Sequence, residues 1–320
     1  MIFFQIFYKQ QGMVGLFSDS WPTELLTRCI GIAILFLIYK LVNHNAHVRE
    51  SPHTNAFDGC SSVNCIRCNG RIQDDNIKVI VDELNKENHS GLERVNRWYR
   101  GLGSKGDHKR QPTVMFFPDI ISNPGIKHDQ FFDDVQKLQC NSDTILAEYK
   151  KICDSMTESN GWKTNSTPQG RWNVFYLINQ GFEIKMNSKQ CPKTMAILQQ
   201  LDNLMDDCCF GNACFSVVYP NTTISEHYGP CNIRARCHLG LVIPSGFILN
   251  VDDIQLRWRE GKCLIFDDSY LHRVVHNVED GESDHNLKRV VFMVDLWHND
   301  LSEIEINALT KLFPASHCDL

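Results

Sequence analysis

The feature that most constrains the fold is a series of short segments with period-two or wholly apolar character in the C-terminal half. Between Ala235 and His276 only brief turn sequences separate them, among them Glu260-Gly261, which fits a two-residue hairpin turn, and Pro244–Gly246. Many short strands with brief turns are typical of a sandwich or barrel, and eight fit a double-stranded β-helix, or jelly roll. The eight predicted strands are Trp172–Ile178, Phe215–Tyr219, Ala235–Ile243, Phe247–Val251, Ile254–Trp258, Lys262–Phe266, His272–His276 and Arg289–Trp297.

Helical patterns flank this region, so the predicted fold is mainly β with flanking helices around a jelly-roll core. Apolar residues recur at helical spacing, and one apolar run before Pro118 predicts a further buried strand. We expect one or two helices in Ile77–Trp98, the strand at Val114–Phe117, and helices at Phe131–Cys153, Lys193–Met205 and Ser302–Leu312.

The N-terminal region contains a candidate membrane anchor. Residues Leu25–Val42 include an uncharged apolar run, and Arg28 and Lys40 at its edges can extend their charges toward the two interfaces. A buried core helix or a cleavable signal peptide would also fit, and the flanking charges do not decide orientation. We therefore predict a tail at 1–24, a transmembrane signal anchor at 25–42, a linker and helical segment at 43–113, the catalytic-type domain at 114–298, and a C-terminal helix and tail at 299–320.

Composition narrows the classes of partner and compartment. The 320 residues carry a net charge of −6, and no concentrated basic surface of the kind that nucleic-acid backbones require is evident. The 14 cysteines leave room for disulfides in an oxidising compartment. We expect a local disulfide at Cys65 and Cys68. A second group is close enough in sequence to allow one bridge among its members: Cys191, Cys208, Cys209 and Cys214. Three triplets would permit N-glycosylation in a lumenal domain, at Asn88, Asn165 and Asn221.

Candidate site residues converge in the segment from Phe215 to His238 and its downstream partners. Strand alternation places Arg236 and His238 on one face of their strand, and imidazoles from separate strands can ligate iron or zinc. Buried guanidinium groups require anionic partners. A pocket lined by such groups therefore predicts a metal together with a small dicarboxylate, bound by His227, His238, His272, Arg236, Arg289 and Ser216.

Three sequence blocks resemble the aspartyl/asparaginyl β-hydroxylase family, and among its members most the membrane-anchored aspartate β-hydroxylase domain-containing proteins. The blocks are HYGPCNIRARCHLGLVIP, WREGKCLIFDDSYLHRV and RVVFMVDLWH. The resemblance implies an iron(II) and 2-oxoglutarate dependent dioxygenase that uses O2 to hydroxylate the β-carbon of Asp or Asn in a protein, such as a small disulfide-rich extracellular domain. It also implies a single-pass type II protein of the endoplasmic reticulum or secretory pathway, with the catalytic domain in the lumen.

The resemblance assigns roles to individual positions. His227 and His272 match the two iron ligands, and Arg289 matches the arginine that anchors the distal carboxylate of 2-oxoglutarate. Ser216, Arg236 and His238 match further co-substrate contacts. Gly229 stands where most 2-oxoglutarate oxygenases carry an acidic ligand, and the family is similar in lacking it.

Two other classes of function stay open at this level. One is a catalytically inactive, membrane-anchored binding or adaptor protein that retains the oxygenase fold. The other is a zinc-binding structural or lectin-like domain, which would use the histidines but leave the arginines without a role.

Overall fold

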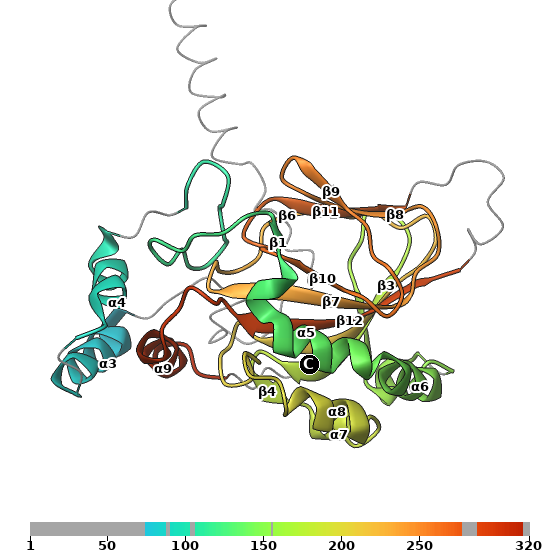
Figure 1. Cartoon of the computed structure of the whole chain (residues 1–320), viewed down its shortest axis with the longest axis horizontal. Coiled ribbons are helices and arrows are strands. Elements are labelled where there is room, and N and C mark those ends of the chain that lie inside the picture. The colour runs from blue at the N-terminus through green and yellow to red at the C-terminus, as the bar shows by residue number, and fades with distance from the viewer. Residues whose placement is uncertain (1–73, 88–89, 103–105, 155, 277–286, 316–320) are drawn as a thin grey trace, which may run out of the picture. The chain divides into compact units, whose positions relative to one another are not determined.

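Two antiparallel sheets form the centre of the molecule in the computed structural model, which describes residues 74–87, 90–102, 106–154, 156–276 and 287–315. The larger sheet has the strand order β1-β10-β7-β12-β5-β3-β2, with β4 paired to β3, and the smaller has the order β6-β11-β8-β9. Figure 1 shows the smaller sheet lying over one face of the larger. The strands are β1 Gly125–Ile126, β2 Trp162–Asn165, β3 Trp172–Asn179, β4 Phe182–Glu183, β5 Asn212–Val218, β6 Ile224–His227, β7 Arg234–Val242, β8 Phe247–Val251, β9 Ile254–Leu256, β10 Cys263–Phe266, β11 His272–His276 and β12 Arg289–Trp297.

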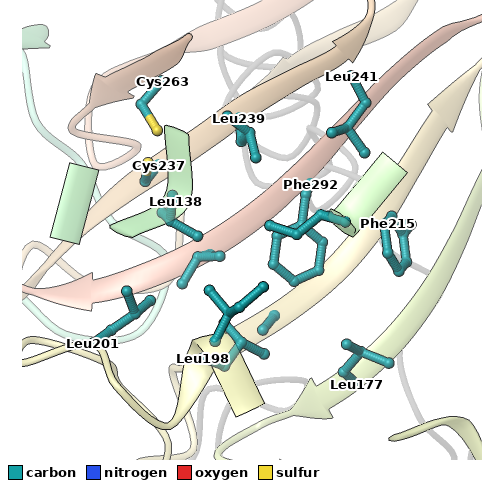
Figure 2. Close-up of a cluster of buried hydrophobic side chains, with 14 of the residues drawn as sticks. Leu138, Leu177, Leu198, Leu201, Phe215, Cys237, Leu239, Leu241, Cys263 and Phe292 are labelled. Atoms are coloured by element: carbon teal, nitrogen blue, oxygen red, sulfur yellow. The ribbon is translucent and has the colours of Figure 1, made fainter. Parts of the chain in front are cut away.

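Helices cover the opposite face of the larger sheet. Alternation along β7 and β12 sends Leu239 and Phe292 to this face, where they pack with Leu138 and Leu198 from the helices (Figure 2). The helical elements are α3 Asp74–Glu87, α4 Glu93–Arg97, η1 Trp98–Leu102, η2 His128–Phe131, α5 Phe132–Cys140, α6 Ser142–Ile152, η3 Glu158–Asn160, α7 Lys185–Ser188, α8 Pro192–Leu198 and α9 Glu303–Leu312. The other face of the larger sheet is thereby left to meet the smaller sheet, and the candidate site lies between them.

A second apolar core joins the N-terminal helices to the C-terminal one. Val81 of α3 and Val95 of α4 pack with Leu309 of α9. Arg94 adds charge-assisted bonds, with its Nε 2.7 Å from Oε1 of Glu305 and its Nη1 3.1 Å from Oδ2 of Asp300. The one or two helices predicted in Ile77–Trp98 are therefore present as α3 and α4, and both pack against α9.

The eight predicted strands correspond to β3, β5 and β7–β12, so the mainly β architecture with flanking helices is confirmed. The hairpin prediction at Glu260-Gly261 was wrong. These residues do form a turn, but β9 before it belongs to the smaller sheet and β10 after it to the larger one. The turn therefore carries the chain between the two sheets rather than joining paired neighbours.

Three other predicted elements differ from the structure. Val114–Phe117 forms no continuous strand. Met115 makes a single isolated β-bridge to Cys231, and Val114 N donates to Pro230 O at 3.0 Å. The helix predicted at Phe131–Cys153 divides into η2, α5 and α6, and at the junction of α5 and α6 the Asn141 amide donates to the Lys137 carbonyl. The helix predicted at Lys193–Met205 ends at Leu198, because the Asp134 carboxylate holds the backbone of the loop that follows.

The cysteine and sequon predictions are corrected in part. Cys191, Cys208 and Cys209 are free thiols, so the bridge that the spacing of the four cysteines allowed is not formed. Cys191 lies in the core under the larger sheet, and the other two lie in the second core. Asn165 is buried in β2, which makes it a poor glycosylation acceptor, whereas Asn221 is exposed. Cys65, Cys68 and Asn88 lie outside the described residues.

The predicted anchor at 25–42 also lies outside the described residues. Within the part of the chain that the structure does describe, none of the helices has the length and apolar character needed to cross a membrane.

Candidate active site between the two sheets

His227 and His272 form a pair at the edge of the smaller sheet. His227 is the last residue of β6, and His272 is the first residue of β11. The two are direct partners in the antiparallel register, and their ring centroids lie 4.1 Å apart. Both side chains are buried. Two residues separated by 45 positions of sequence are therefore brought into contact by one strand pairing.

Hydrogen bonds fix the tautomer of both rings. His227 Nδ1 lies 2.8 Å from the carbonyl of Ser225, and His272 Nδ1 lies 2.9 Å from the carbonyl of Tyr270. A carbonyl only accepts, so each Nδ1 carries the proton and each Nε2 keeps its lone pair. Burial lowers the pKa of His227, and burial together with the neighbouring His227 holds the pKa of His272 well below its ordinary value. Neutral imidazoles held in this way are the form that ligates metals.

Gly229 has no room for a side chain. A Cβ built at this position would lie 2.5 Å from the carboxyl carbon of Asp268, and the Gly229 N–H donates to the Asp268 carbonyl at 2.6 Å. The place where an acidic side chain would start is thus already filled by the carboxylate of another residue. The described residues contain no group of three or more His, Cys, Asp or Glu side chains arranged to hold a metal ion.

The Asp268 carboxylate belongs to a buried cluster of two aspartates and two arginines. Arg234 donates to it through Nε and Nη2, and Arg236 Nη1 lies 3.1 Å from its Oδ2. Arg236 also donates to Asp295 through Nε at 2.8 Å and Nη2 at 3.0 Å. Burial alone would raise the pKa of Asp268, but the charges of Arg234 and Arg236 outweigh it and lower that pKa far below its ordinary value. Charges balance within this cluster.

Arg289 differs from the other two buried arginines because no carboxylate pairs with it among the described residues. It begins β12, is 1% exposed, and donates from Nη2 to Ser216 Oγ at 3.2 Å. Its Nε is buried and has no hydrogen-bond partner in the described part of the chain. Burial without a counter-charge lowers its pKa to about 9. An unbalanced buried cation of this kind is the expected complement of an anionic ligand.

His238 lies between Arg289 and the histidine pair. Its Nδ1 accepts a bond from Trp258 Nε1 at 3.1 Å, while its buried Nε2 has no partner among the described residues. The Trp258 ring also lies under Arg289, with 4.7 Å from the guanidinium carbon to the ring centroid. Phe266 connects the two halves of the site, since its ring contacts both His238 and His272. The ring of Phe266 therefore lies between the histidine pair and the group that contains His238 and Arg289.

Of the six predicted site residues, the structure brings His227 together with His272, and His238 together with Arg289 and Ser216. Arg236 lies on the same strand as His238, but its donors are directed to Asp295 and Asp268. Its assignment as a co-substrate contact stays a prediction.

Sequence reasoning missed four residues that hold the others in place, namely Asp268, Asp295, Trp172 and Trp258. The pair Asp267-Asp268, directly after an apolar strand and four to five residues before His272, was the visible signal. Asp295 was visible as the single acidic residue in a strand whose only other charged residue is Arg289. Nothing in the sequence around Trp172 and Trp258, apart from the strand pattern, indicated that they support the site.

Comparisons with known proteins identify the family of the chain. The profile of the family described as Aspartyl/Asparaginyl beta-hydroxylase matches residues 139–299. Aspartate beta-hydroxylase domain-containing protein 2 of Xenopus tropicalis is 40% identical over 269 residues, which cover 81% of this chain and 71% of that protein. Aspartate beta-hydroxylase domain-containing protein 1 of Mus musculus is 37% identical over 235 residues, covering 70% and 63%.

Solved structures resemble the chain only distantly. A prolyl-4-hydroxylase from Pseudomonas putida has a TM-score of 0.34 and 12% identity, covering 49% of this chain and 87% of that one, which is too distant to inform on function. The family profile and the relatives, in contrast, span most of the described residues. The chain belongs to the aspartyl/asparaginyl β-hydroxylase family.

Proposed function

We propose that the protein is an iron(II) and 2-oxoglutarate dependent dioxygenase that hydroxylates the β-carbon of Asp or Asn side chains in proteins. The observation that carries the proposal is the buried arrangement in which a histidine pair with fixed tautomers is linked, through Phe266, His238 and Trp258, to the uncompensated cation of Arg289. A role as metal ligands explains the histidine pair, and an anionic co-substrate explains the cation of Arg289. A purely structural core would have no use for an unpaired buried guanidinium.

The donor set fits iron bound by two protein ligands. His227 and His272 would hold the metal through Nε2, and imidazole suits iron(II). Their Nδ1 bonds to backbone carbonyls orient the rings and raise the basicity of the ligating nitrogens. With Gly229 closed to a side chain, the remaining coordination positions would be taken by the co-substrate and water.

The hydrogen-bond donors of Arg289, Ser216 and His238 fit a dicarboxylate. Arg289 and Ser216 would hold the distal carboxylate of 2-oxoglutarate, while His238 would donate nearer the metal. When bound, iron(II), 2-oxoglutarate and O2 supply the oxidation, in which the co-substrate becomes succinate and carbon dioxide and one oxygen atom enters a substrate C–H bond. The protein itself binds, orients and excludes water, since apolar residues from both sheets, such as Val291 and Leu249, pack in the space between them.

The proposed substrate class is that of the family to which the chain belongs. The family name specifies aspartyl and asparaginyl side chains, and the exposed Glu226–Arg273 ion pair at the edge of β6 and β11 lies next to the histidine pair. A protein segment that reaches the histidine pair would therefore pass close to this ion pair.

The experiment is turnover of 2-oxoglutarate by the purified protein. We expect succinate formation that requires iron(II), and we expect His272→Ala to abolish it. The matched control is His128→Ala, an exposed histidine in η2 outside the site, which should leave turnover unchanged. Absence of succinate from the wild type with iron(II), ascorbate and candidate Asp- or Asn-containing peptides would favour an inactive binding protein instead.

We also propose that the domain faces the lumen of the secretory pathway, tethered by the apolar segment at 25–42. The support is that segment and the exposed sequon at Asn221. In cells, glycosidase treatment should increase the electrophoretic mobility of the protein. Asn221→Gln should reduce that shift, whereas Asn165→Gln at the buried sequon should not. A protein that shows no shift under any condition would contradict the lumenal placement.

A further inference from the structure

Two tryptophans donate their only N–H to residues of the candidate co-substrate pocket. Trp258 Nε1 donates to His238 Nδ1 at 3.1 Å, and Trp172 Nε1 donates to Ser216 Oγ at 3.0 Å. Both tryptophans and both acceptors are buried. Because an indole N–H can donate but never accept, each bond fixes the role of the atom that receives it.

The bond from Trp258 determines where His238 carries its proton. Nδ1 must present a lone pair to the indole, so the neutral ring holds its proton on Nε2. Burial, with the charges of Arg289 and Arg236, lowers the pKa of His238 well below its ordinary value, which keeps the ring neutral. The orphaned Nε2 is therefore a buried N–H donor.

The bond from Trp172 has the same effect on Ser216. A hydroxyl has two acceptor positions and one proton, and the oxygen of Ser216 receives bonds from both Trp172 and Arg289 Nη2. Both acceptor positions are used, so the hydroxyl proton is left to donate. Arg289 has no acceptor atoms at all.

We propose that Trp172 and Trp258 are positioning residues that make His238, Ser216 and Arg289 present only donors, so that the pocket selects a carboxylate and rejects the matching carboxamide. The inference rests on the proposed function for the identity of the ligand, 2-oxoglutarate. A carboxylate offers acceptors alone and satisfies every donor. A carboxamide would place its own N–H groups against donors and leave buried groups unpaired.

The ring of Trp258 has a second, separable role. It lies 4.7 Å from the guanidinium carbon of Arg289 and stabilises that cation by a cation–π contact in the absence of a carboxylate partner among the described residues. Phenylalanine keeps an aromatic face but lacks the N–H. Trp258→Phe therefore removes the hydrogen bond to His238 while retaining much of the support for Arg289.

The first test reads the tautomer of His238 directly, by nitrogen-15 NMR of the metal-free wild-type protein. We expect a proton on Nε2 and an acceptor-type Nδ1, and we expect Trp258→Phe to lose this preference. The matched control is Trp162→Phe, which also loses a buried indole bond, from Nε1 to the Ile152 carbonyl at 3.1 Å, but outside the pocket. A proton on Nδ1 in the wild type would overturn the inference, whatever the protein binds.

The second test compares the affinities for 2-oxoglutarate and for 2-oxoglutaramate, its distal amide, with manganese(II) in place of iron. We expect the wild type to prefer the carboxylate by at least about 100-fold, and Trp172→Phe to lower that ratio by about tenfold. We expect Trp258→Phe to weaken 2-oxoglutarate binding roughly tenfold relative to Trp162→Phe. Equal affinities of the wild type for the two ligands would refute the inference. So would an equal loss of 2-oxoglutarate affinity in Trp258→Phe and in the control Trp162→Phe. Failure of the wild type to bind either compound would instead refute the proposed function, and the NMR result would still decide the donor arrangement.

Discussion

Replacing Asp268 by alanine is expected to lower the free energy of unfolding by about 3–5 kcal/mol. The variant would leave Arg234 without its main carboxylate partner and Arg236 with only Asp295, in a region that excludes water. Breaking one member of a buried ion-pair cluster costs more than the pair itself contributes, because a charge stays behind unpaired. Urea unfolding followed by fluorescence measures the effect.

The matched control is Asp253→Ala. The side chain of Asp253 is 74% exposed and lies 3.9 Å from Lys109, so its removal should change the unfolding free energy by less than about 0.5 kcal/mol. If the two alanine variants were equally stable, the cluster would not be the structural support that the geometry indicates. A large loss of unfolding free energy in Asp268→Ala would show that the charge balance of the buried aspartate–arginine cluster stabilises the protein.

Introducing a carboxylate at Gly229 is expected to damage the site rather than complete it. In the Gly229→Asp variant the new Cβ would lie 2.5 Å from the Asp268 carboxyl carbon, far inside normal contact, and a second negative charge would enter the same buried space. We expect a loss of about 2–4 kcal/mol in unfolding free energy and no gain in iron affinity. Unfolding and iron(II) titration of the variant measure the two quantities.

The double variant Gly229→Asp with Asp268→Gly tests whether steric collision with Asp268 causes the loss of stability in Gly229→Asp. It moves the carboxylate from one side of the contact to the other, removing the collision and keeping the charge near the two arginines. We expect it to be more stable than the sum of the two single changes predicts. Additive losses, or tighter iron binding by Gly229→Asp alone, would contradict the conclusion that Asp268 blocks this position.

The period-two patterns were sufficient to predict the β architecture and its helical flanks. Segments such as Phe247–Val251 and Arg289–Trp297 were predicted with their observed bounds because side-chain alternation is a local property. Sheet membership is not local. Nothing around Glu260-Gly261 shows that the chain changes sheets there. The strand β6, which carries His227, was missed because its sequence, ISEH, has neither an alternating nor an apolar pattern.

The candidate site residues could be identified in the sequence, but the residues that support them could not. Histidines and arginines of the right type stand out in a sequence, and the family resemblance placed His227, His272 and Arg289. Their roles nevertheless depend on partners brought together by tertiary structure. Arg236 and Arg289 look alike in sequence, yet the first lies between two aspartates and the second lacks a carboxylate among the described residues. Likewise, the space beside Gly229 is filled by a residue 39 positions later in the sequence.

The most direct measurement of the central claim is an anaerobic titration of the protein with iron(II) and 2-oxoglutarate, followed by visible absorption. Chelation of the metal by the co-substrate within one site produces a charge-transfer band that neither ligand gives alone. We expect the wild type to develop this band with one iron per chain, His272→Ala to lose it, and Arg289→Ala to require much more 2-oxoglutarate. A wild type without the band, or a His272→Ala variant that retains it, would contradict the assignment of this site as the iron and 2-oxoglutarate centre.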